Sequence, residues 1–368
     1  MEIKRQSPDW WIFFVVMALL GIGIIMVFSS SQYLAQYDYG DPYYYLKSQA
    51  KNAGLGLIAM FIAYKINYKV YKKLAWPIFG LVIILLLLVL FSGSGESAGG
   101  AERWLNLAGF RFQPSEVCKL AMILLLAKIC SDHQKSMASF TRGFLPCIAL
   151  TLVAALLVFA QNALSSASII AVTAVIMMYC AGVRWQYLGA TVGIGFAAGI
   201  AVIANTEFRA NRIAAYLDPW KDPLGDGFQT VQSLLAIGNG GLTGVGLGAG
   251  GSKWYYLPEG YTDFIFSVLA EEMGFLGCLF VIALFGILIW RGLMVAIGLK
   301  DMFCSLLALG ATVMIGLQAF INLGVVTGLL PVTGVTLPFI SYGGTSLIIC
   351  LISMGILLNL SRYAEIKR

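Results

Sequence analysis

The stretch at residues 255–272, YYLPEGYTDFIFSVLAEE, closes a long polar segment and opens an apolar one. Asp263 lies at the junction, where a chain leaving water would enter a lipid bilayer, and Glu271 and Glu272 follow inside the apolar run. An acid at membrane depth costs roughly 2.5 to 3.5 kcal/mol on insertion scales, so these acids are functional candidates by default. The rest of the sequence indicates what surrounds these three acids.

The composition is that of a polytopic membrane protein. Of the 368 residues, 59% are hydrophobic and 11% are charged, whereas soluble domains are about 25% charged. The net charge of +6 is therefore interpreted as membrane topology rather than as a nucleic-acid-binding surface. The seven cysteines form no CxxC or Cys/His cluster, so the sequence predicts neither a disulfide framework nor a zinc site. His133 is the only histidine, which argues against a Ser-His-Asp triad.

Apolar runs near the ~20 residues that span a bilayer recur along the chain. A charged start before the first run resembles a signal peptide, but no small-residue cleavage site follows, so this run is interpreted as a retained helix. The sequence thus predicts an all-α membrane protein with ten transmembrane helices, at 10–28, 53–66, 74–91, 116–131, 143–160, 164–182, 185–205, 263–290, 302–327 and 341–360.

Loop charges orient these predicted spans. Most of the 24 lysines and arginines fall in the loops 65–73, 128–142, 183–186 and 291–301 and at the two chain ends. By the positive-inside rule, both termini are then cytoplasmic. Most of the 18 acids fall on the outer side. Residues 1–368 are predicted to form a single transmembrane domain, with a large outer loop at 206–262 between the seventh and eighth helices.

The outer face carries the irregular sequence, at 92–115, 161–166, 206–262 and 328–344. Within 206–262, residues 228–237 predict a short interfacial helix and the glycine-rich 238–251 predicts irregular backbone. The stretch PVTGVTLPFISYGGTS at 331–346 predicts a re-entrant or irregular segment, which is tolerated only where protein or a water-filled cavity covers it. These features together predict a cavity that opens outward.

The first polar constellation is Arg103-Trp104 followed by Gln113, Glu116 and Lys119. Glu116 and Lys119 are three residues apart, so they share one face of a helix. In the structural interpretation they form a satisfied ion pair beside an interfacial tryptophan. In the functional interpretation they form the polar wall of a cavity, where the lysine can bind an anionic ligand.

The second constellation places Arg209, Arg212 and Lys221 on the outer face, beside the glycine-rich stretch 238–251. Such backbone can present N–H groups to phosphate, but no GxxxxGK[ST] motif is present, so ATP binding has no support. The alternative is an ordered surface loop with solvated charges.

Asp263 and the two glutamates form the third constellation. At a helix N-terminus the dipole favours a carboxylate, so Asp263 is expected to stay ionised and could be a general base, a metal ligand or a helix cap. Glu271 and Glu272 lie roughly 12 Å deeper, at about 1.5 Å per residue. They are offset from Asp263 by roughly 80° and 180° around the helix. They cannot both face its cavity, so at least one is structural.

Across nearly its whole length the sequence resembles the SEDS family (shape, elongation, division and sporulation). The motifs occur in the family's order: RW…FQPSE…K, DPW.DPLG.GFQ…QS..AIG.GGL.G.GLG, LPE..TDFIF..LAEE.G and LP..GVTLPFISYGG.S. The form GVTLPFISYGG and the ending LLNLSRY are more similar to the FtsW and SpoVE branch than to RodA.

The resemblance implies a peptidoglycan glycosyltransferase in the bacterial cytoplasmic membrane, with ten transmembrane helices and an outward-facing active site. Its substrate would be lipid II, a disaccharide-pentapeptide on undecaprenyl pyrophosphate, which it would polymerise into β-1,4 glycan strands during division or sporulation. Its partner would be a class B penicillin-binding protein, a transpeptidase. The family's proposed catalytic aspartate falls on Asp263, and the Glu and Lys of its QPSE..K motif fall on Glu116 and Lys119.

This chemistry fits the residues. Asp263 would deprotonate the acceptor's GlcNAc 4-hydroxyl as it attacks the donor's anomeric carbon with inversion. Cations, together with a divalent ion such as Mg²⁺ or Mn²⁺, would stabilise the pyrophosphate charge. No organic cofactor and no nucleic acid are expected. The expected substrate- and pyrophosphate-binding residues are Lys119, Glu116, Arg103, Trp104, Arg209, Arg212, Gln113 and Ser341.

The turn at residues 161–166 departs from the family pattern. It reads QNALSS, where the family usually has Gln-Pro-Asp-Leu-Gly-Thr, so a carboxylate is replaced by Ala163. A smaller departure is Tyr261, where the family often has Gln or His. Two rival functions therefore stand beside the polymerase: a lipid II flippase, and a weakened scaffold that recruits a penicillin-binding protein. The absence of a visible inverted repeat argues against a transporter.

Overall fold

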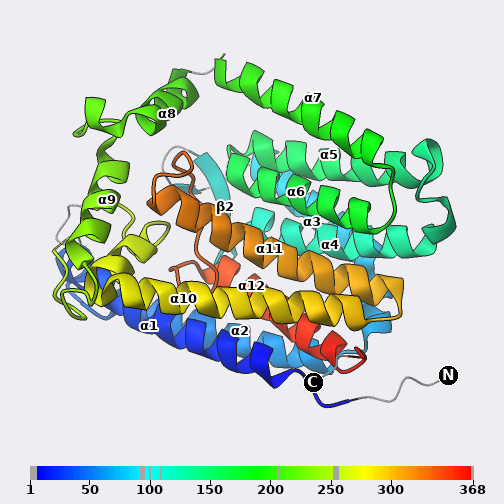
Figure 1. The fold of residues 1–368 in the computed structure, drawn as a ribbon, viewed down its shortest axis with the longest axis horizontal. Helices are drawn as coiled ribbons and strands as arrows, with labels where there is room; N and C mark the ends of the chain where they lie inside the picture. The colour runs from blue at the N-terminus through cyan, green and yellow to red at the C-terminus, as the bar shows by residue number, and fades with distance from the viewer. Residues whose placement is uncertain are drawn as a thin grey trace.

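The computed structural model describes residues 6–91, 96–98, 101–107, 110–204, 207–251 and 257–365. Within these ranges, side chains are not described at 96–98, 101–103, 106–107, 110–111, 202–204 and 207–211. Long helices lie side by side along most of the molecule (Figure 1). Their bounds are α1 Trp10–Tyr39, α2 Tyr44–Lys65, α3 Tyr68–Phe91, α4 Pro114–Asp132, α5 Leu145–Ala160, α6 Leu164–Cys180, α7 Trp185–Ala204, α10 Ile265–Gly298, α11 Met302–Val326 and α12 Gly344–Ser361.

Each predicted span falls on one of these helices, which confirms an all-α polytopic membrane protein. The helix at the second span begins at Tyr44 rather than near residue 53, because its first turns are polar and carry no apolar signal. Six segments of the described chain are long and apolar enough to cross a membrane: Trp10–Tyr39, Tyr68–Phe91, Phe140–Ala160, Ile265–Gly298, Met302–Val326 and Gly344–Ser361. Crossing by the other four helices stays a prediction.

The two chain ends meet at one end of the helix bundle. The backbone N–H of Gln6 donates to the carbonyl of Arg362 at 2.8 Å, and Lys300, between α10 and α11, pairs with Glu365 at 2.5 Å. The loops that carry most of the basic residues lie at this same end (Figure 1). The grouping agrees with the predicted topology, whereas the side of the membrane that it faces stays a prediction.

Helix α12 packs most closely against α2. An added Cβ at Gly355 would lie 2.3 Å from the backbone carbonyl oxygen of Met60, so only glycine permits this approach, as is common between membrane helices. Helix α7 lies at the opposite edge, apart from the other long helices (Figure 1). Its centre is exposed at Ile194 and Phe196.

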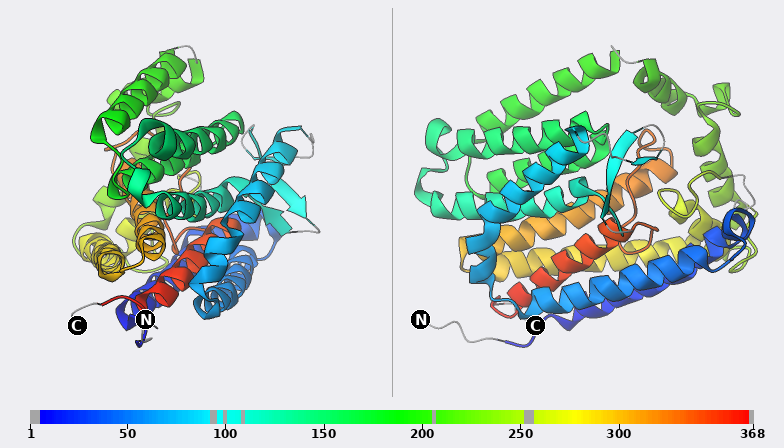
Figure 2. Two further views of the ribbon diagram at one scale, coloured as in Figure 1. Left: turned by 90° about the vertical axis from the view of Figure 1, so that its right-hand side faces the viewer. Right: turned by 180° about the vertical axis from the view of Figure 1, so that it is seen from behind.

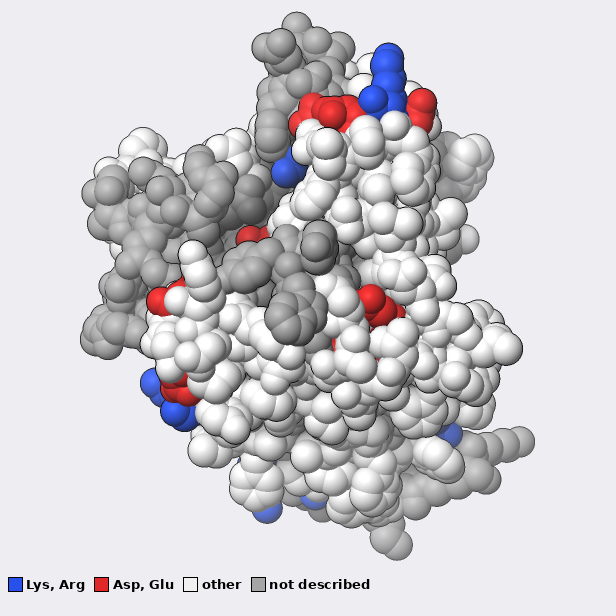
Figure 3. Space-filling view, turned by 90° about the vertical axis from the view of Figure 1, so that its left-hand side faces the viewer, with Lys and Arg blue, Asp and Glu red and all other residues white. Residues whose placement is uncertain are grey.

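The end opposite the termini carries most of the connecting structure. Residues 92–115, expected as a loop, contain three short antiparallel strands, β1 Glu96–Ala98, β2 Ala101–Leu107 and β3 Phe110–Phe112. This small sheet projects from the side of the bundle (Figure 2). Acidic side chains reach the surface at several separate points of this end (Figure 3).

The long segment 206–262 is more helical than its sequence indicates. Helix α8 (Glu207–Leu217) was not predicted, whereas α9 (Phe228–Gly240) confirms a helix at the predicted residues and continues three residues further; its interfacial position stays a prediction. Irregular backbone follows from Gly241. The segment 328–343, which we call the return segment, contains no helix or strand, so its prediction as irregular chain is confirmed.

Candidate active site

Asp263 lies in the tight turn that precedes α10. The helix begins at Ile265 with Phe264 at its N-cap position, and no side chain caps it. The helix-cap interpretation of Asp263 is therefore wrong. The turn is built on Glu259, whose φ of 56° is left-handed and whose carbonyl accepts from the N–H groups of Thr262 and Phe264.

Two carboxylates meet at one hydroxyl in this turn. The Oγ1 atom of Thr262 lies 2.8 Å from Oδ1 of Asp263 and 2.8 Å from Oε2 of Glu259. A hydroxyl has one proton to donate, so Thr262 can serve only one of the two carboxylates at a time. The arrangement also offers hard oxygen atoms of the kind that Mg²⁺ and Mn²⁺ bind. Among the described residues, however, no three His, Cys, Asp or Glu side chains lie together.

Burial raises the pKa of Asp263 to about 6, although the Thr262 hydroxyl and the Arg212 guanidinium lower it; the charge of Glu259 raises it further. The helix N-terminus therefore does not keep this pKa low, because desolvation outweighs the favourable contacts, but a carboxylate with a pKa of about 6 is still mostly ionised at neutral pH, as predicted. A pKa near the operating pH is the condition under which a carboxylate works best as a general base.

The return segment lies directly beside this turn. The side-chain amide of Asn322, on α11, donates to the backbone carbonyl of Asp263 at 2.6 Å and to that of Val335 at 2.8 Å. The N–H of Tyr342 donates to the carbonyl of Tyr261 at 3.0 Å. The tertiary structure thus joins two sequence constellations that lie some 70 residues apart.

Glu116 and Lys119 form the expected ion pair on one face of α4. Nζ and Oε1 are 2.8 Å apart, and the two side chains are only 9% and 2% exposed. The second carboxylate oxygen of Glu116 and the hydroxyl of Ser115 have no hydrogen-bond partner in the described chain. A buried pair with an unsatisfied oxygen is costly, which favours a functional role over the purely structural one.

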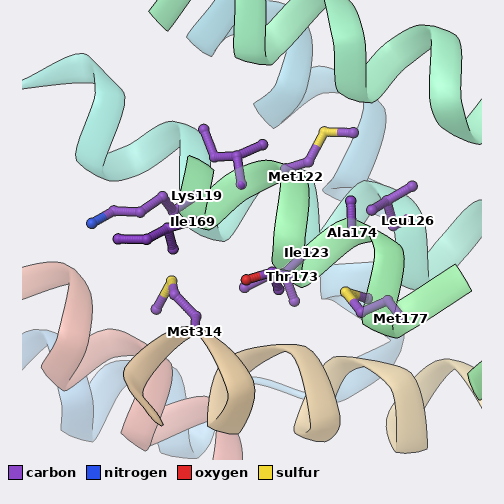
Figure 4. Close-up of a pocket in the computed structure, with 10 residues that line it drawn as sticks. Lys119, Met122, Ile123, Leu126, Ile169, Thr173, Ala174, Met177 and Met314 are labelled. Atoms are coloured by element: carbon purple, nitrogen blue, oxygen red, sulfur yellow. The ribbon is translucent and has the colours of Figure 1, made fainter. Parts of the chain in front are cut away.

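Lys119 also lines a small internal cavity between α4, α6 and α11. Its volume of about 10 Å³ is enough for one water molecule. The hydroxyl of Thr173 faces this space, and the Lys119 nitrogen points away from it (Figure 4). No hydrogen bond or ion pair in the described chain joins Asp263 to Glu116 or Lys119, so the two polar groups are separate in this conformation.

The stretch 341–345 connects these two polar groups. The hydroxyl of Thr345 accepts from the backbone N–H of Gln113 at 3.2 Å, while Tyr342 contacts the Asp263 turn. Ser341, predicted to bind substrate, is buried, and its hydroxyl accepts from the N–H of Leu337 at 2.8 Å. The Ser341 hydroxyl therefore bonds to the protein backbone in this structure, and its predicted contact with substrate stays a prediction.

The predicted cations lie in different surroundings. Arg212, on α8, is exposed, donates to the carbonyl of Val332 at 3.4 Å, and lies close enough to Asp263 to affect its pKa. Tyr216 donates to the carbonyl of Leu329 at 3.1 Å, so α8 docks on the return segment. The side chains of Arg103 and Arg209 lie outside the described residues, and Trp104 is half-buried on β2.

Glu271 and Glu272 are both engaged within the protein. Ser29 lies 2.7 Å from each carboxylate oxygen of Glu272, and the N–H of Gly251 donates to Oε1 of Glu271 at 3.0 Å. This agrees with the prediction that at least one of them is structural. The backbone carbonyls of both glutamates also accept N–H groups from Val245 and Gly246. These parts of the glycine-rich loop therefore bind helix α10, rather than the phosphate that the sequence suggested.

Comparison with known proteins identifies the family. The FtsW/RodA/SpoVE family model, described as "Cell cycle protein", matches residues 9–366. The chain belongs to the FtsW/RodA/SpoVE family. It is 43% identical to stage V sporulation protein E of Bacillus subtilis (strain 168), over 99% of this chain and 100% of the relative. It is also 43% identical to a probable peptidoglycan glycosyltransferase FtsW of Geobacter sp. (strain M18), over 97% and 98%.

Solved structures of the family share the fold. A chain from "Structural coordination of polymerization and crosslinking by a peptidoglycan synthase complex" is 32% identical, with a TM-score of 0.79, over 97% of this chain and 98% of that chain. The rod shape determining protein RodA of Thermus thermophilus is 29% identical, with a TM-score of 0.70, over 98% and 99%. The predicted likeness to the FtsW and SpoVE branch is confirmed by the 43% identities.

The departing turn has its own geometry in this FtsW/RodA/SpoVE member. Asn162 has a φ of 58°, which proline cannot adopt because its ring fixes φ near about −65°. Ala163 occupies the N-cap of α6 and makes no capping bond. An aspartate at position 163 would therefore stand at the N-cap of α6.

Restoring the family residues one at a time should therefore have opposite effects on stability. Ala163→Asp is expected to stabilise the protein by about 1 kcal/mol, by capping α6. Asn162→Pro is expected to destabilise it by about 3 kcal/mol, because it forces φ and removes the N–H bonded to the Phe159 carbonyl. Thermal unfolding in detergent measures both variants, and equal midpoints for the two would contradict this turn geometry.

Three site residues were missed in the sequence. Glu259 and Thr262 lie inside the quoted LPE..TDFIF motif. Their closeness to Asp263 in the sequence could have identified them as site residues. Asn322 is a polar residue in an apolar helix, a pattern that marks functional positions in membrane proteins. Only the fold shows that all three contact Asp263 or its turn.

Proposed function

We propose that this protein polymerises lipid II into β-1,4 glycan strands at the outer face of the bacterial cytoplasmic membrane, with Asp263 as the general base. As a member of this family, it is a peptidoglycan glycosyltransferase of division or sporulation. The observation that supports the proposed base is the partly buried carboxylate, with a pKa of about 6, in a turn held between α10, α11 and the return segment.

In the proposed reaction, the GlcNAc 4-hydroxyl of the acceptor attacks the anomeric carbon of the donor. The hydroxyl proton passes to the Asp263 carboxylate as the new C–O bond forms and the bond to the pyrophosphate breaks. The configuration inverts, so no second carboxylate nucleophile is needed. The product is a lengthened strand, and the leaving group is undecaprenyl pyrophosphate. Asp263 then returns its proton to water before the next addition.

The leaving pyrophosphate needs positive charge nearby. Arg212 is an exposed cation whose charge acts on the Asp263 carboxylate. Lys119 is buried, so its contact with substrate requires the helices around it to move. Mg²⁺ or Mn²⁺ would neutralise the same charge.

The topology and the partner complete this proposal. We propose ten transmembrane helices with cytoplasmic termini, which would put Asp263 outside, at the end opposite the basic loops. A class B penicillin-binding protein is the proposed partner, since a solved relative comes from a peptidoglycan synthase complex that coordinates polymerisation and crosslinking.

The test is conversion of fluorescent lipid II by the purified protein in detergent, with and without the class B partner. The polymerase hypothesis predicts that glycan chains form at a rate that rises as the pH passes about 6, because Asp263 must lose its proton to act as the base. A flippase would instead move lipid II across liposomes without forming glycan. A scaffold would form no glycan alone and would only raise the partner's crosslinking. Either result would replace the proposed function.

A further inference from the structure

Asn322 is buried in the bundle, with 1% of its surface exposed. Its Nδ2 atom lies 2.6 Å from the carbonyl oxygen of Asp263 and 2.8 Å from that of Val335. Carbonyl oxygens only accept, so the NH₂ group must face both of them. Both amide protons are therefore used, and each holds a different segment of the chain.

The turn that carries Asp263 is held by this contact and by the bond from the N–H of Tyr342 to the carbonyl of Tyr261. Its own bonds, from Thr262 and Phe264 to the carbonyl of Glu259, shape the turn but do not fix it against the bundle. The ladder of α10 begins only at Ile265. The bond from Asn322 ties the backbone of Asp263 itself to α11.

The Oδ1 atom of Asn322 has an energetic cost that indicates the role of this side chain. It is buried and has no donor in the described chain, which carries a desolvation cost. An apolar side chain would avoid this cost but would leave one part-buried and one buried carbonyl without this donor. The side chain is therefore suited to holding the Asp263 turn and the return segment together.

We propose that Asn322 is a positioning residue for Asp263. By holding the backbone carbonyl, it sets the place and depth of the carboxylate and limits the access of water to it. This inference rests on the proposed role of Asp263 as the base. The other groups that act on this carboxylate are Thr262, Glu259 and Arg212, and none of them holds its backbone to α11.

The test compares Asn322→Ala with Asn359→Ala. Asn359 is also a buried asparagine; its amide donates to the carbonyl of Tyr64 at 2.5 Å, and its Oδ1 likewise lacks a donor. It lies near the chain ends, far from Asp263 along the bundle. Asn322→Ala loses two amide–carbonyl bonds and Asn359→Ala loses one, with the same loss of side-chain volume, so a general loss of stability affects both.

Asn322→Ala is expected to polymerise lipid II about 10-fold to 100-fold more slowly, the scale of a misplacement near 1 Å. Its acidic pH limb should move from about 6 towards the ordinary aspartate value, because the released carboxylate gains water. Asn359→Ala should keep the wild-type midpoint of the pH–rate profile and the wild-type rate per folded molecule. Hydrogen exchange of amides 259–264 should be faster only in Asn322→Ala.

The positioning role would be overturned if the two variants had equal polymerisation rates, equal midpoints of the pH–rate profile and equal hydrogen exchange of amides 259–264. If Asn322→Ala does not fold, Asn322→Ser keeps one donor and should show a smaller shift in the same direction; an unchanged midpoint and exchange there would also overturn it. A separate experiment shows whether the proposed role of Asp263 as the base is wrong. In that case Asp263→Asn would remain active, whatever the Asn322 variants do.

Discussion

Replacing Asp263 with asparagine is expected to lower lipid II polymerisation by about 100-fold to 10,000-fold, the range that a general base contributes. Asparagine has nearly the same shape and can still accept from the Thr262 hydroxyl, which now lies 2.8 Å from Oδ1. It cannot take the proton of the attacking sugar hydroxyl. The residual rate should also lose its rise through about pH 6, because the group that titrates there is gone. Glycan product per folded molecule, measured across pH, checks both expectations.

Asp41→Asn is the matched control. Asp41 lies between α1 and α2 and pairs with exposed Lys47 at 2.7 Å, so the substitution removes a carboxylate outside the proposed site. It should leave the rate and its pH dependence unchanged. A rate for Asp263→Asn within a few-fold of that control would show that another group acts as the base.

Gly274→Ala is expected to destabilise the protein by about 3 kcal/mol or more, through a strained backbone and an overpacked contact. Gly274 breaks α10 with a φ of 66°, and an added Cβ would lie 2.3 Å from the N atom of Gly244 and 2.7 Å from the carbonyl carbon of Leu242. The neighbouring atoms are backbone, so they cannot move aside independently. Moving the loop would break its bonds to the carbonyls of Glu271 and Glu272. The thermal unfolding midpoint in detergent measures the loss.

Gly286→Ala tests the same change in the same helix. An added Cβ at Gly286 meets no atom within 4 Å, so alanine should be neutral or slightly stabilising there. If the two variants unfold at the same temperature, the break at Gly274 does not depend on glycine.

The apolar runs were sufficient to predict the helices, because membrane helices satisfy their own backbone and need only a long hydrophobic segment. The same reasoning placed Glu116 and Lys119 on one face, since their spacing is a local property of the helix. It missed the first turns of α2, helix α8 and the three strands. These elements are polar or short, so they contain no long apolar run of the kind that marks a membrane helix.

The sequence alone also determined that Asp263 stands where the chain enters the bundle, and that Glu271 and Glu272 cannot both share its face. The tertiary structure decided the protonation behaviour of Asp263, because burial sums over many neighbours while the helix N-terminus acts only locally. It also decided which groups hold the acid in place. Asn322 is 59 residues away along the chain, and no local pattern links it to the turn. Only the packing of α11 against α10 and the return segment brings its amide to that carbonyl.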